Sequence, residues 1–240
     1  MNTKNNSGNT EYKTGYYSSV FLTVITIITF GFAITAVPIS GAFCPEGCTD
    51  YPYLDTLKQF PKDFLWMYLA VFLVLAYLVF MVSLHFFASD EKKIYSQIAL
   101  SFAIISTMIL VSDYFIQSLV IPASLENGET EGIPLLIQYN SHGVFLALEE
   151  LGYLLMSLSF LFIAPVFHSA NRLQAAIRWI FIMAFIVTFL SFVVVSAKYG
   201  IGREDRFEVI IISVDWLVLI INGTLTGILF RRSFNDQKIT

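Results

Sequence analysis

Charged residues are scarce in this chain. They make up 13% of its 240 residues, whereas a soluble domain carries about 25%. The 14 Lys and Arg residues and 18 Asp and Glu residues leave a net charge of −4. They form no basic patch that could neutralise a phosphate backbone. The composition is therefore not that of a soluble domain, and it gives no support to nucleic-acid binding.

Cysteine is equally scarce. Cys44 and Cys48 are the only two, and they lie in CPEGC. The three intervening residues differ from the two of a CxxC redox motif, and only acids such as Glu46 and Asp50 lie near enough to assist metal binding. Because the segment is expected on an oxidising side of a membrane, we predict a disulfide, with two free thiols as the alternative.

Motifs that would assign a cofactor are absent from the sequence. It has no HExxH motif of membrane metalloproteases. It also lacks a buried Lys in its last apolar window, as a retinal protein would need, and the paired-His pattern of membrane desaturases. The reaction, the metal and the cofactor, if any, are left unassigned.

Hydrophobic residues, in contrast, reach 56%, including 23 Phe. A helix needs about 20 apolar residues to cross a bilayer, and the backbone in lipid must satisfy its own hydrogen bonds. We therefore predict an all-α fold, a polytopic membrane helix bundle with six transmembrane helices. The predicted spans are Tyr17–Val37, Phe64–Phe87, Ser96–Ile121, Val144–Phe167, Ala175–Val195 and Phe207–Phe230.

The two ends of the chain are polar. Residues 1–16 are predicted to be a disordered tail, residues 17–230 the transmembrane domain and residues 231–240 a C-terminal tail. The first apolar window could suggest a signal peptide, but its core of about 20 residues exceeds the usual 7–15. We expect it to be retained as a helix.

Lys and Arg predict the orientation, because they are more frequent in cytoplasmic loops. Most of them lie on the side of the termini: Lys4, Lys13, Lys92, Lys93, Arg172, Arg178, Arg231, Arg232 and Lys238. Both termini are therefore expected in the cytoplasm of a multi-pass cell-membrane protein. The two long external loops would then be 38–63 and 122–143, and Lys198, Arg203 and Arg206 would lie on the same side. The second loop, with NGETEG, is either an acidic vestibule that attracts cations or an ordinary solvated loop.

Four carboxylates lie well inside the predicted spans: Asp113, Glu149, Glu150 and Asp215. An Asp at the centre of a membrane costs about 2.5–3.5 kcal/mol on insertion scales, so such residues usually have a function. At about 1.5 Å per residue, Asp113 and Asp215 lie about 12 Å and Glu149 about 8 Å from the external surface. This shared depth predicts one site built from three helices.

Neutral polar residues accompany these acids at helical spacing. Gln117 follows Asp113 by four residues, and Asn222 follows Asp215 by seven. Tyr153 and Ser157 follow the glutamates in the same way. His142 precedes Glu149 by seven residues and could be a proton partner, or simply an interfacial histidine. Glu149 and Glu150 must point about 100° apart.

Several carboxylates in a low dielectric cannot all be ionised without compensation, so either some are protonated or a cation lies among them. We therefore predict a small transporter coupled to a cation or proton, with the lipid bilayer as its other partner. In one alternative, a membrane enzyme, two carboxylates would act as acid and base on a lipid or isoprenoid. In the other, a non-catalytic membrane subunit or sensor, the acids would pair with Lys198, Arg203 or Arg206, or hold helices together.

One stretch carries a resemblance. LEELGYLLMSLSFLFIAPVF at 148–167, together with the six-span layout, resembles uncharacterised prokaryotic six-helix membrane proteins that are grouped as domains of unknown function. The resemblance implies membership of this membrane class. It assigns no catalytic residue, substrate or oligomeric state.

Overall fold

Six long helices form the protein. The computed structural model describes residues 3–36 and 38–237, and within these ranges it contains helices and no strands. Each long helix is apolar and long enough to cross a membrane, which confirms the predicted all-α, six-span class. The helices are α1 (Thr3–Ala33), α2 (Leu65–Phe87), α3 (Lys93–Phe115), α4 (Ile121–Glu126), α5 (Ile133–Leu136), α6 (Val144–Ile163), α7 (Arg172–Tyr199) and α8 (Arg206–Gln237).

The ends of the first and last helices differ from the prediction. Helix α1 begins at Thr3, so residues 3–16 are helical rather than a disordered tail, and α8 continues to Gln237. Aromatic packing stabilises the helix before the predicted span, because the ring of Tyr12 lies 6.5 Å from that of Phe87 and 6.4 Å from that of Phe230. Residues 1–2 and 238–240, and Val37 at the predicted end of the first span, lie outside the described residues.

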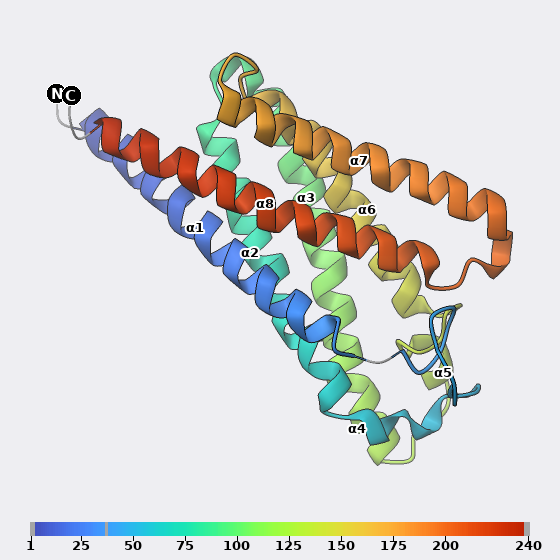
Figure 1. Ribbon diagram of the computed structural model, residues 1–240. Helices are drawn as coiled ribbons and strands as arrows, with labels where there is room; N and C mark the ends of the chain where they lie inside the picture. Colours follow the sequence, from blue (N-terminus) through green and yellow to red (C-terminus); the bar gives the residue numbers. More distant parts are fainter. Residues whose placement is uncertain (1–2, 37, 238–240) are drawn as a thin grey trace.

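The long helices pack in a closed circuit. In chain order, α1 packs against α2, α2 against α3, α3 against α6, α6 against α7, α7 against α8 and α8 against α1, while α6 also contacts α8 (Figure 1). Helix α6 therefore touches both α3 and α8. This is the arrangement that the predicted carboxylate site requires.

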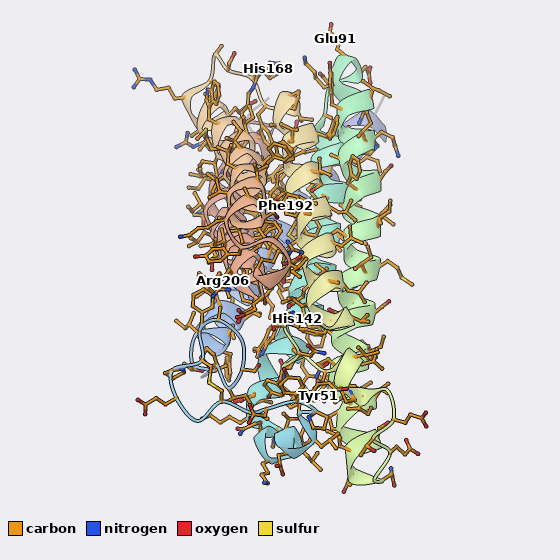
Figure 2. The ribbon with its side chains drawn as sticks, turned by 90° about the vertical axis from the view of Figure 1, so that its right-hand side faces the viewer. Tyr51, Glu91, His142, His168, Phe192 and Arg206 are labelled. Carbon is orange, nitrogen blue, oxygen red and sulfur yellow. A yellow bond between two sulfur atoms is a disulfide. The ribbon has the colours of Figure 1, made fainter. Side chains whose placement is uncertain are left out.

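Both termini lie at one end of the bundle (Figure 1). Figure 2 shows Glu91 and His168 at that end, and Tyr51 and His142 toward the opposite end, which we call the distal end. Termini at the same end are what six spans require. That this end faces the cytoplasm stays a prediction from the distribution of Lys and Arg.

The third span is longer than predicted. Helix α3 continues without a break through a π-helical segment, Ile116–Val120, into α4. Such segments are rare in proteins, and those that occur are often found at functional sites. Side chains bond the carbonyl groups of this wider turn: the Ser118 hydroxyl donates to the Tyr114 carbonyl at 2.5 Å, and the Tyr68 hydroxyl donates to the Ser118 carbonyl at 3.1 Å.

The two cysteines form the predicted disulfide. Cys44 and Cys48 are bonded, with Cα atoms 6.0 Å apart, in the loop between α1 and α2. The backbone N–H of Thr49 donates to the carbonyl of Ile39 at 2.7 Å, which folds the loop back on itself. The disulfide therefore closes a small ring within a folded loop at the distal end.

Close contact between α1 and α8 depends on a glycine. A Cβ atom added to Gly223 would lie 2.4 Å from the Thr23 hydroxyl oxygen and 3.3 Å from the Ser19 carbonyl oxygen. Small residues at such positions let transmembrane helices approach closely.

We expect Gly223→Ala to lower the thermal stability of the detergent-solubilised protein, by about 1–3 kcal/mol, because the added methyl group overpacks this contact. The double variant Gly223→Ala/Thr23→Ala should recover much of the loss. Gly31→Ala is the matched control, since a Cβ there meets nothing within 4 Å. Equal stability of Gly223→Ala and Gly31→Ala would contradict the close contact.

Candidate functional site

The four carboxylates predicted from the sequence are all buried. Glu149 and Asp215 are fully buried, and Asp113 and Glu150 are 3% and 6% exposed. They come from α3, α6 and α8. A buried carboxylate is costly unless hydrogen bonds or charges compensate it, and the structure compensates Glu149, Glu150 and Asp215 in different ways.

Glu149 accepts the last hydrogen bond of an aromatic chain. The Tyr114 hydroxyl donates to Glu149 Oε1 at 2.7 Å and lies 2.8 Å from the Tyr153 hydroxyl, to which Trp216 Nε1 donates at 3.0 Å. Each hydroxyl has one proton, so Tyr153 must donate to Tyr114. The chain therefore runs from Trp216 through Tyr153 and Tyr114 to Glu149. Among the described residues, Glu149 Oε2 has no hydrogen-bond donor.

Glu208 is the neighbour of Glu149 that the sequence analysis missed. The two carboxyl groups are close enough for their charges to interact, and two like charges this close in a buried site favour keeping a proton on one of them. The predicted sixth span begins at Phe207, so Glu208 looked like a boundary residue. Its spacing of seven residues from Asp215, which places both on one face of α8, is the signal that could have identified it.

Glu150 points elsewhere and is paired. Its Oε2 forms a salt bridge with Arg203, whose guanidinium also lies 5.6 Å from the ring centre of Phe192 and 5.8 Å from that of Phe207. Helix geometry requires adjacent residues to diverge, and Glu149 and Glu150 do so. Glu150 is therefore compensated by a fixed cation.

Asp215 is compensated by hydroxyl groups. The Ser157 hydroxyl donates to Asp215 Oδ1 at 2.7 Å, and Thr188 lies 3.0 Å from Ser157. Asn222, further along α8, donates to the carbonyl of Ile177 at 3.2 Å. The structure therefore places Asp215 and Asn222 in contacts with α6 and α7, apart from the Glu149 and Glu208 pair.

The remaining candidates lie at different distances from this pair. Asp113 is close enough to Glu149 for their charges to interact. Gln117 is fully buried in the π-helical segment, and neither of its amide atoms has a hydrogen-bond partner among the described residues. His142 is exposed in the loop before α6, and its backbone N–H donates to Asn140 at 2.9 Å. The hydrogen bonds and ion pairs found in the described residues do not link it to either glutamate.

A cavity of about 310 Å³ lies at the distal end beside Glu208. It lies between the end of α1, the α1–α2 loop, the start of α2, the segment before α6 and the first turns of α8. Its lining includes three carboxylates, Asp63, Asp205 and Glu208, and the aromatic residues Phe30, Trp66, Tyr139, Phe145 and Trp216. Burial raises the pKa of the Tyr139 hydroxyl, with a further contribution from the nearby Asp63 carboxylate.

The α1–α2 loop is attached to the start of α8 across this cavity. The Ala42 backbone N–H donates to Asp205 Oδ1 at 2.8 Å. Gly41 has a φ of +75°, and a Cβ there would lie 2.5 Å from Asp205 Oδ2. A glycine is therefore required both by the backbone conformation and by the contact with the carboxylate.

Comparisons of the chain with models of protein families, with curated proteins and with solved structures found no match. Within residues 3–36 and 38–237, no three or more His, Cys, Asp or Glu side chains are grouped so that they could hold a metal ion. The six long apolar helices define a six-span helical membrane protein. The function of its site is inferred from the chemistry of the residues that form it.

We expect the Glu150–Arg203 pair to be worth more than a surface pair. Arg203→Gln should destabilise the solubilised protein by about 3 kcal/mol, because it leaves a buried carboxylate without its cation. Glu150→Gln/Arg203→Gln should be less destabilised than the sum of the single variants, with a coupling energy of about 1–3 kcal/mol. Thermal unfolding of the four proteins measures this coupling.

The matched control is Arg206→Gln, which removes a looser pair with Glu204 at 3.6 Å. Such a pair contributes about 0–1 kcal/mol. Additive effects of Arg203→Gln and Glu150→Gln would contradict the proposed compensation.

Proposed function

We propose that the protein is a small proton-coupled transporter of the cell membrane. In this proposal, Glu149 and Glu208 hold the coupling proton, and the cavity beside Glu208 holds the transported solute on its way across the bundle. Glu150, bound to Arg203, positions the start of α8 and carries no proton.

One observation carries the proposal. Glu149 is fully buried, accepts a hydrogen bond through one oxygen and leaves the other without a donor among the described residues, and its charge interacts with that of Glu208, which lines the cavity. Two carboxyl groups in contact inside a protein favour binding one proton, because both cannot be ionised together at low cost. Since Glu208 also borders the cavity, the charge of the pair depends on what the cavity contains.

The two other functions have weaker support. A lipid-modifying enzyme would need room for its substrate beside an acid and a base, yet the cavity beside Asp63 and Glu208 has a volume of only about 310 Å³, too small for the two acyl chains of a membrane lipid. A non-catalytic subunit would have its acids paired with external cations or bonded between helices. Among the described residues Glu150 has such a cation, and Glu149 and Asp215 accept hydrogen bonds from other helices. Such a role gives no reason for Glu208, a second carboxyl group beside Glu149, to line a cavity.

Proton binding is tested by thermal unfolding of the solubilised protein across pH. Protons that bind the folded site stabilise it, by about 2.7 kcal/mol at 100 times the dissociation constant. We expect Glu149→Gln to lose this acid-dependent gain. Glu91→Gln, an exposed acid at the opposite end (Figure 2), should keep it.

The same measurement with Na⁺, K⁺, Mg²⁺, Ca²⁺ and Zn²⁺ at fixed pH separates a proton from a metal cation. A shift specific to one ion and lost in Glu149→Gln would make that ion the coupling ligand. Identical pH and ion profiles for the wild type and Glu149→Gln would refute a coupling site at Glu149.

Transport further requires that the site opens alternately to the two sides. Because both native cysteines are in a disulfide, introduced cysteines report access to a membrane-impermeant maleimide. Ser213 lines the distal cavity, and Thr226 is fully buried nearer the termini. Ser213→Cys and Thr226→Cys therefore report access from the two sides. Between neutral and acid pH, we expect the labelling of one cysteine variant to rise several-fold while that of the other falls. Adding Glu149→Gln to each variant should remove this dependence on pH.

Asn127→Cys, exposed in a distal loop, corrects for the effect of pH on maleimide chemistry. If Ser213→Cys is labelled equally at every pH and Thr226→Cys under no condition, the cavity is static and transport is excluded.

A further inference from the structure

We propose that the distal cavity binds a small organic cation: an amine with an aromatic or short aliphatic body. The inference rests on the proposed transport function and names the class of solute that the same site would take. It is carried by the charge, the walls and the size of the cavity.

The charge of the cavity favours a cation. Three carboxylates line it, and its described lining residues include no Lys, Arg or His. Asp205 is engaged by the Ala42 backbone N–H, which leaves Asp63 and Glu208 for a ligand. Asp63 is 9% exposed, with the exposed Lys62 as its neighbour in sequence. An anion would be repelled here, and a neutral ligand would leave the carboxylates without a counter-charge.

The walls suit an organic cation rather than a bare ion. The rings of Trp66 and Trp216 lie 6.4 Å apart, at an interplanar angle of 60°, and both line the cavity. Aromatic faces attract ammonium groups and bury apolar bodies, and Trp is the strongest of them.

A polar group in the wall supports the same ligand. Tyr139 is 9% exposed, and its hydroxyl lies near Gln138 and Asp63 without a hydrogen bond of normal geometry in the described residues. A buried hydroxyl is normally hydrogen-bonded. Its oxygen can accept an N–H of an ammonium group whose charge faces Asp63, so both groups would be satisfied by one ligand.

The size of the cavity limits the body of the ligand. Its volume of about 310 Å³ is at the low end of ligand sites, which span about 300–1,000 Å³. A single ring or a short chain fits, whereas the two acyl chains of a membrane lipid do not.

The position of the bound cation would explain how binding of the amine is coupled to binding of a proton. Glu208 borders the cavity and meets Glu149 behind it. An ammonium group beside Glu208 and a proton on the Glu149–Glu208 pair compensate the same negative charge. Binding of one therefore weakens binding of the other, which is the condition for exchange of an amine against a proton.

The test compares three compounds with one phenyl ring and different charge: phenethylamine, 2-phenylethanol and phenylacetate. Titration calorimetry on the solubilised full chain should show binding of the amine, with the alcohol weaker by about tenfold or more and the acid not bound. Tryptophan fluorescence in a Trp179→Phe background gives a second readout, because Trp179 is 58% exposed on α7 and the other two Trp residues line the cavity.

The variants localise the binding. Glu208→Gln and Asp63→Asn should each weaken phenethylamine about tenfold and leave 2-phenylethanol unchanged. Asp55→Asn is the matched control, an exposed acid of the same loop that pairs with Lys58. Equal affinity for the amine and the alcohol, or unchanged amine binding in both variants, would overturn the inference. If Glu208→Gln does not fold, Asp63→Asn decides alone.

The two proposals fail separately. If acid still stabilises the wild type but not Glu149→Gln, while phenethylamine does not bind, the organic-cation inference is wrong and proton coupling stands. If phenethylamine binds equally at all pH values and in Glu149→Gln, the cavity is a cation site without coupling, and the transport proposal is wrong.

Discussion

The hydrogen bond from Tyr114 to Glu149 is the interaction on which the centre of the bundle depends. It is the last of three hydrogen bonds that begin at Trp216, and together the three bonds join α3, α6 and α8. The ring of Trp216 also packs against Phe30 of α1 and Trp66 of α2. The buried carboxylate of Glu149 therefore orients the hydrogen-bonded side chains of α3, α6 and α8. Through Trp216, this network also packs against α1 and α2.

The acids differ in what compensates them, and this difference assigns their roles. Glu150 has a guanidinium, Asp215 has a serine hydroxyl, and Glu149 has the aromatic chain on one oxygen only. Glu208 has another carboxyl group. A fixed cation makes Glu150 a structural residue, whereas the pair formed by Glu149 and Glu208 lacks a cation of its own within the described residues. Asp113 and Asp215 also lack a cation there, but neither is among the described lining of the cavity, whereas Glu208 is. The proposed exchange of charge is therefore assigned to this one contact between α6 and α8.

Composition and window length were enough to predict the six spans, because lipid leaves a buried backbone few alternatives. The depth of Asp113, Glu149 and Asp215 predicted one site on three helices. The structure has the contacts of α6 with α3 and α8 that this site requires, but Asp215 bonds Ser157, apart from Glu149 and Glu208. The spacing of Cys44 and Cys48 led to the correct disulfide. These features depend on local sequence or on distance along a helix, which a single sequence carries.

The rest depends on which helix faces meet, and a single sequence does not carry that. Glu208 lies at the boundary of an apolar window, so its contact with Glu149 becomes visible only when α6 and α8 are packed together. The pairing of Glu150 with Arg203 and the cavity itself involve segments far apart in the chain. The helical start of α1 follows from aromatic contacts of Tyr12 with α2 and α8, which override a polar sequence.

The first turn of α8 and the residues just before it combine three separate contacts. Asp205 holds the α1–α2 loop over the cavity, Glu208 lines the cavity and meets Glu149, and Arg203 binds Glu150. Asp205 lies just before α8, and its carbonyl accepts a hydrogen bond from the backbone N–H of Val209 at 3.1 Å, so Asp205 and Glu208 are held together by the first turn of the helix. Any movement of this turn therefore changes the cover of the cavity, the spacing of the carboxyl pair and the buried salt bridge together. Proton coupling needs a segment of this kind. The start of α8 is attached both to the loop over the cavity and to the carboxyl pair, so through it a ligand in the cavity can change the protonation of Glu149.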